Sequence, residues 1–316
     1  MRELLSKPAA RMLAQLAVSA LILWALFRDA NLGAVWQTLK GGSLWMLVGA
    51  LLVKAVGLLV HEARLWLALP VPRPPLPRVI SLGLVAGVLN LALPARAGDV
   101  AAIAMLEREC EVPVPVGTAA VGVTSFLEAA LFAFFLMAVL GMGAAQWADI
   151  MGSDQNPAMW IGLALLGGCI VLATMGILGR QLRDRPAPQS RILALVQQIL
   201  IETAQMVGSG RYLMIQSAVA AAQVVVVVVA FSLAMMASGA GVDDPVTSAS
   251  MVLAVSSLAS FVLPPTMAAG PDAASSLVLP HFGADPTGAL AYATVYWVVA
   301  HLPAVCMGLP SLFARR

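Results

Sequence analysis

The sequence predicts an all-α integral membrane protein, and two observations support this. Of the 316 residues, 60% are hydrophobic and only 11% are Asp, Glu, Lys or Arg, whereas soluble domains carry roughly 25% charged residues. The apolar residues also form long runs that approach the ~20 residues a spanning helix requires. So few charges cannot cover a water-facing surface for a chain of this length, but lipid tails accept apolar side chains.

Six runs are predicted to cross the membrane as helices. They are Met12–Phe27, Leu44–Val60, Val116–Gly141, Met159–Gly179, Leu213–Ala237 and Gly288–Phe313. A basic head precedes the first run as in a signal peptide, but no small-residue cleavage site follows, so we expect an uncleaved first helix. Pro303 predicts a bend in the last run.

Two further stretches are pairs of short apolar segments interrupted by proline, glycine and charge. The pairs are Val79–Leu93 with Val100–Leu106, and Val246–Leu263 with Ala273–Leu279. Such interruptions at membrane depth are typical of re-entrant hairpins. The residues expected to form the turns are Pro94, Gly98, Pro264, Pro265 and Gly270.

The two interrupted stretches have the same order: Leu-Pro, a small-residue turn with glycine, an aspartate, then a second apolar helix. With six spans, one hairpin opens to each side of the membrane, which predicts an inverted repeat. We therefore expect a single membrane domain over residues 1–316. Its repeat-like halves are about 44–141 and 212–313, linked by 142–211.

Basic segments predict the orientation of the chain. The N-terminus, Arg64–Arg78, Arg180–Arg211 and the C-terminal arginines are basic, whereas the loops at Asp149–Asp154 and Asp243–Asp244 have no Lys or Arg. The positive-inside rule then places both termini in the cytoplasm and the protein in the cytoplasmic (inner) membrane. Within the second basic segment, residues 190–209 show helical apolar spacing. This predicts either an amphipathic helix on the membrane surface or a linker helix packed on the bundle.

The turn from Pro94 to Asp99 is the leading candidate for a binding site. Arg96 offers a planar fork suited to phosphate, Gly98 permits backbone that larger residues resist, and Asp99 is expected to cap the second half-helix. The hypothesis is that Arg96 binds a lipid phosphate, with Asp99 and Arg64 positioning it. The alternative is a structural turn in which Arg96 and Asp99 satisfy each other.

Other ionisable residues lie within the predicted spans or just beyond their ends. Lys54, His61 and Arg64 share one helix, where Arg64 either takes part in the site or extends to the interface. Glu128 is near the middle of its span and needs a partner such as Arg96 or Lys54, or a proton. A structural ion pair and a transport-linked proton site are both open readings of Glu128.

Three segments resemble the lysylphosphatidylglycerol synthase transmembrane region, also called the flippase-like membrane domain. They are Arg64-Leu65-Trp66, Leu93-Pro94-Ala95-Arg96-Ala97-Gly98-Asp99, and Leu263-Pro264-Pro265-Thr266 with Gly270. From about Met12 to its end, the chain resembles the membrane half of the bacterial multiple peptide resistance factor without its aminoacyltransferase half. The resemblance adds Thr266 and Asp272 of the second hairpin to the expected lipid-binding residues.

The resemblance implies translocation of a lipid between leaflets, with no enzyme activity and no cofactor. Expected partners are membrane lipids, including anionic phospholipid, and either a second copy or a lipid-modifying enzyme. A net charge of +2 gives no indication of nucleic acid binding. A non-catalytic scaffold for a lipid-modifying enzyme is the alternative. A transferase is disfavoured because the sequence has no Walker loop, nucleophile elbow, zinc motif or paired carboxylates.

The orientation is testable with reporter fusions at Asp154 and Arg316. We expect the two reporters to lie on opposite sides of the membrane, with Arg316 in the cytoplasm and Asp154 outside. The reason is that the basic segments fall on one side of the predicted spans. Reporters on the same side would contradict the six-span topology.

Overall fold

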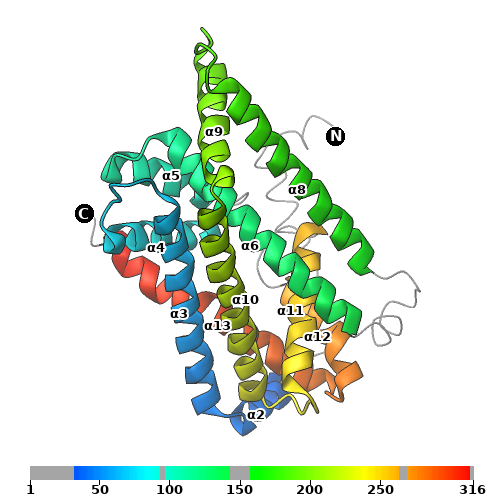
Figure 1. Cartoon of the computed structure of the whole chain (residues 1–316). Coiled ribbons are helices and arrows are strands. Elements are labelled where there is room, and N and C mark those ends of the chain that lie inside the picture. Colours follow the sequence, from blue (N-terminus) through cyan, green and yellow to red (C-terminus); the bar gives the residue numbers. More distant parts are fainter. Residues whose placement is uncertain (1–31, 93–96, 143–156, 263–268, 314–316) are drawn as a thin grey trace, which may run out of the picture. The chain divides into compact units, whose positions relative to one another are not determined.

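The computed structural model describes residues 32–92, 97–142, 157–262 and 269–313 (Figure 1). Helices connected by short turns make up this part of the chain. In order they are α2 (Leu32–Gly41), α3 (Leu44–Ala68), α4 (Leu76–Ala92), α5 (Ala97–Cys110), α6 (Val114–Met142), α8 (Pro157–Leu182), α9 (Arg191–Gly208), α10 (Gly210–Ser238), α11 (Pro245–Val262), α12 (Ala269–Val278) and α13 (Pro286–Phe313), with a 3-10 turn at Leu279–Phe282.

Five of these helices are long and apolar enough to cross a membrane: α3, α6, α8, α10 and α13. They coincide with five of the six predicted spans, and the sixth, Met12–Phe27, lies outside the described residues. α3 continues eight residues beyond the predicted end at Val60. The prediction was short because His61, Glu62 and Arg64 broke the apolar run. α2 was not predicted as a helix.

The chain divides into two compact units, and the division falls within α3, α10 and α13 and before the last residue of α6. The described part of the first unit comprises residues 32–55, 142, 226–262 and 269–303. That of the second comprises residues 56–92, 97–141, 157–225 and 304–313.

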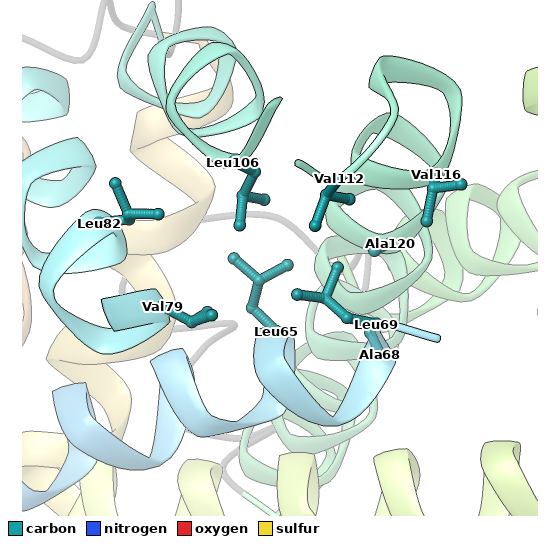
Figure 2. Packing of buried hydrophobic residues seen from close by; sticks show 9 residues of the cluster. All are labelled: Leu65, Ala68, Leu69, Val79, Leu82, Leu106, Val112, Val116 and Ala120. Carbon is teal, nitrogen blue, oxygen red and sulfur yellow. The ribbon is translucent and has the colours of Figure 1, made fainter. Parts of the chain in front are cut away.

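An apolar core holds α3, α4, α5 and α6 together in the second unit. Figure 2 shows side chains from all four helices converging on one another. The core residues are Leu65, Ala68, Leu69, Val79, Leu82, Leu106, Val112, Val116 and Ala120. In lipid, where apolar side chains gain little by leaving the solvent, such a core stabilises the unit through close packing.

α4 and α5 pack against each other as an interrupted pair. Asn90 of α4 links them: its Oδ1 accepts from the Gly98 N–H at 2.7 Å, and its Nδ2 donates to Asp99 Oδ1 at 2.8 Å. A Cβ on Gly98 would overlap the Ala86 carbonyl oxygen. Gly98 is therefore needed for close approach, not for a left-handed backbone. Asp99 was predicted to cap α5, but it lies inside the first turn of that helix.

α8 and α9 form a helical hairpin (Figure 1). A Cβ on Gly179 would overlap the carbonyl group of Leu200, so the two helices approach closely. The buried Gln197 amide of α9 donates to the carbonyl oxygens of Leu182 (2.9 Å) and Arg185 (3.1 Å), which satisfies the end of α8. The amphipathic segment is therefore a helix that packs on α8.

The first unit contains the other interrupted pair, α11 and α12, which also pack on each other. Asp244 caps α11, accepting hydrogen bonds from the Thr247 hydroxyl at 2.6 Å and from the Val246 and Thr247 amides. These bonds, above all that from the Thr247 hydroxyl, hold the pKa of Asp244 below its usual value. The Phe231 and Tyr296 rings stack in the same unit, with centroids 4.1 Å apart.

Substitution of Gly98 by alanine tests the packing of α4 on α5. Gly98→Ala is expected to destabilise the purified protein by about 1–3 kcal/mol, because the added methyl forces the helices apart. Gly87→Ala on α4 is the matched control, since no atom lies within 4 Å of its added Cβ. Thermal unfolding in detergent measures both. Equal unfolding temperatures for the two variants would contradict the close approach.

Candidate functional site: a buried polar cluster in the second unit

Arg64 of α3 is the centre of the candidate site. Its side chain is only 1% exposed, although arginine is almost never fully buried unless paired. Nη1 donates to Gln223 Oε1 at 2.7 Å and to Glu128 Oε2 at 3.1 Å, and Nη2 donates to the Thr124 carbonyl oxygen at 2.9 Å. Three of its five N–H groups therefore meet protein acceptors. Nε is buried without a partner among the described residues.

Glu128 of α6 neutralises this guanidinium. The same carboxylate oxygen that accepts from Arg64 also lies 3.0 Å from His61 Nδ1. The other oxygen accepts from Gln223 Nε2 at 2.8 Å. The side chains of Glu128 and His61 are 32% and 45% exposed, so the cluster is buried at Arg64 and partly exposed at His61 and Glu128.

Two glutamines of α10 complete the cluster. Gln223 is buried and contacts Arg64, Glu128 and His61, the last at 3.2 Å from its Nε2. Gln216, seven residues earlier and so on the same helix face, donates to the Arg64 carbonyl oxygen at 3.0 Å. An amide both donates and accepts, which lets Gln223 bridge a guanidinium and a carboxylate.

A cavity of about 160 Å³ adjoins the cluster. Its lining includes the side chains of His61, Glu62, Arg64, Asn90 and Asp99. Glu62 is 6% exposed, and a Cβ on Gly83 of α4 would overlap its carboxylate. Gly83 thus makes room for a carboxyl group that a larger residue would displace.

The structure brings together some of the predicted site residues. Arg64 and Asp99 line this cavity, and Glu128 pairs with Arg64 beside it. Lys54 belongs to the first unit, where its Nζ lies 5.7 Å from the Phe231 ring centroid. Asp272 and Gly270 also belong to the first unit, at the start of α12, with Asp272 buried. Arg96, Thr266, Pro94, Pro264 and Pro265 lie outside the described residues.

One expectation needs correction. Arg64 does not extend to an interface, because Glu128, Gln223 and Thr124 hold it inside the unit. Glu128 contacts Arg64, His61 and Gln223. None of these three was named as its partner from the sequence, in which the predicted span ended at Val60, before His61 and Arg64.

Sequence reasoning missed Gln223, Gln216 and Asn90 entirely. A usable signal was present, since each is an uncharged polar residue within an apolar helix. Such residues commonly form hydrogen bonds between helices. No group of three or more His, Cys, Asp or Glu in the described part of the chain could hold a metal ion.

Comparison with known proteins agrees with this membrane architecture. The family model described as "Lysylphosphatidylglycerol synthase TM region" matches residues 12–308. The chain belongs to this family. No curated protein matches it. Membership, together with the five apolar helices, establishes a multi-pass membrane protein with a role connected to membrane lipids.

A double-mutant cycle tests the Arg64–Glu128 pair. Arg64→Met alone is expected to cost about 3–5 kcal/mol, because it leaves a carboxylate uncompensated. Glu128→Met added to it should restore part of this loss, with a coupling energy of about 1–3 kcal/mol. Equilibrium unfolding in detergent gives all four stabilities, and Arg191→Met on the exposed end of α9 controls for loss of charge. Simple additivity would show that the pair is not coupled.

Proposed function

We propose that this member of the family translocates a phosphate-bearing lipid between the two leaflets of the cytoplasmic membrane. The observation that carries the proposal is the cavity lined by Glu62, Arg64 and Asp99 within a largely apolar helical chain. Ionisable groups at membrane depth cost about 2.5–3.5 kcal/mol each on insertion scales. A cavity lined by several of them suits a protein that must shelter a polar headgroup from hydrocarbon.

The interrupted helix pairs support a translocation architecture. α4–α5 and α11–α12 each consist of two short helices that pack together, and the second helix of each has an aspartate in its first turn. We interpret them as re-entrant hairpins of opposite orientation, related by an inverted repeat, beside six spans. Paired broken helices build substrate sites near the midplane in many transporters.

The proposal assigns roles to the predicted residues. Arg96 binds the lipid phosphate, with Asp99 and Arg64 positioning it, and Lys54, Glu128, Thr266 and Asp272 contribute along the route. No catalysis or cofactor is required, and both termini are cytoplasmic. The partners are membrane lipids, with a second copy or a lipid-modifying enzyme as a protein partner.

A scaffold for a lipid-modifying enzyme is the second candidate. One observation favours it: three N–H groups of Arg64 already donate to protein acceptors, as expected for an arginine with a structural role. On this reading the cluster sets helix packing, and the cavity carries no headgroup.

Translocation is tested with purified protein in vesicles containing a fluorescent phospholipid. Wild type is expected to expose inner-leaflet lipid to an external quencher faster than protein-free vesicles do. Glu62→Gln keeps the shape of the side chain but replaces the ionisable carboxyl group that lines the cavity. It should slow translocation by about tenfold or more, the equivalent of at least ~1.4 kcal/mol in the barrier.

Glu107→Gln is the control, because Glu107 is exposed on α5 of the same unit and does not line the cavity. It should translocate at the wild-type rate. Wild-type protein no faster than empty vesicles would favour the scaffold. A fully active Glu62→Gln protein would remove the cavity from the mechanism.

A further inference from the structure

A second pocket lies in the second unit at the junction between α9 and α10. Its volume is about 460 Å³, within the roughly 300–1,000 Å³ typical of small-molecule sites. It is lined by Leu67, Arg73, Ser209, Arg211, Tyr212, Ile215 and Gln216. Two of these residues are arginines and none is acidic, so the lining is positively charged.

Trp66, part of the motif Arg64-Leu65-Trp66, holds one of the two arginines in place. The Trp66 indole N–H donates to the Pro74 carbonyl oxygen at 2.7 Å, and this hydrogen bond stabilises the turn after α3. The Arg73 guanidinium lies over the Trp66 ring, 4.9 Å from its centroid. Arg73 also donates to the carbonyl oxygens of Leu69 and Leu67, at 3.1 and 3.3 Å. Its position at the pocket is therefore set before any ligand binds.

The start of α10 supplies the other side. Ser209 caps the helix, its Oγ accepting from the Tyr212 N–H at 3.3 Å. The N-terminus of this 29-residue helix carries a partial positive charge and unpaired N–H groups. Nothing lies within 4 Å of where a Gly210 side chain would begin, so this end of the helix has room beside it. Arg211 forms no ion pair within the described residues.

Two polar groups of the lining have no hydrogen-bond partner among the residues that the structure describes. Gln216 is fully buried; its Nε2 donates to the Arg64 carbonyl oxygen, but its Oε1 meets no donor in the described part of the chain. The Tyr212 hydroxyl oxygen is likewise buried and unpartnered. Buried polar groups are nearly always hydrogen-bonded, so a donor and an acceptor are missing here. A phosphate ester with a neighbouring hydroxyl offers both.

We propose that this pocket binds a phosphate group, either free phosphate or a phosphate diester. Arg73 and Arg211 neutralise its charge, and the Tyr212 hydroxyl donates a hydrogen bond to it. The shared ligand chemistry is phosphate, which a lipid headgroup or free phosphate can supply. Both arginines belong to the basic segments that the positive-inside rule assigns to the cytoplasmic side. The site does not depend on translocation, because it concerns binding alone.

The test measures lipid and phosphate binding to the purified full chain in detergent. Native mass spectrometry reports retention of phosphatidylglycerol, with phosphatidylcholine for comparison. Arg73→Gln/Arg211→Gln should weaken phosphatidylglycerol binding by about tenfold or more, because charge-assisted hydrogen bonds to phosphate are about twice as strong as neutral ones. Arg183→Gln/Arg185→Gln, in the exposed α8–α9 turn, removes the same charge outside the pocket and should change binding less than about threefold.

Two further variants keep the test decisive if loss of Arg73 impairs folding. Arg211→Gln changes only an exposed side chain, and Tyr212→Phe removes only a hydroxyl; each should weaken binding measurably. Inorganic phosphate titrated against bound phosphatidylglycerol separates the two sources. If inorganic phosphate displaces phosphatidylglycerol from the wild type but not from Arg73→Gln/Arg211→Gln, the pocket is a general phosphate site. If phosphatidylglycerol binding depends on the two arginines but phosphate does not displace it, the pocket is a lipid headgroup site. Equal retention in the pocket and turn double variants would overturn the proposal.

Discussion

A guanidinium inside an apolar helix bundle must be neutralised and hydrogen-bonded, and this requirement organises the second unit. Removing a charge from water costs several kcal/mol unless partners are supplied. α6 supplies Glu128 and the Thr124 carbonyl oxygen, and α10 supplies Gln223. The faces of α3, α6 and α10 that meet are therefore the faces that satisfy Arg64. Apolar packing alone, which is adaptable in lipid, would not specify them as strictly.

Small residues decide how closely the other helices approach this cluster. Gly83 leaves room for the Glu62 side chain. Gly98 lets α5 approach α4 closely, so that Asn90 forms hydrogen bonds with the Gly98 N–H and with the Asp99 side chain. Close backbone approach through glycine is a common means of packing helices in membranes. Here it has a second consequence, because it places two carboxylates at one small cavity.

Gln216 connects the two polar regions of the second unit. Its Nε2 bonds to the backbone of Arg64, and its side chain also lines the pocket at the start of α10. The turn after α3, fastened by Trp66, positions Arg73 in the same pocket. A ligand that moved α10 relative to α3 would thus act on the hydrogen bonds of the central arginine. The two regions share α3 and α10, and Gln216 is hydrogen-bonded to the first region while it lines the second.

Composition and hydropathy were enough to predict an all-α membrane protein, the five described helices that are long enough to cross a membrane, and both interrupted pairs. Apolar length and proline or glycine breaks are local properties of the chain. The resemblance to the family rested on short motifs and was confirmed by the match over residues 12–308. The partners of Glu128 and the roles of Gln223 and Asn90 were decided by tertiary structure. Which side chains meet depends on the rotation of each helix about its axis and on its approach to others, and nearly uniform apolar runs such as that after Gln223 carry no periodicity that encodes either.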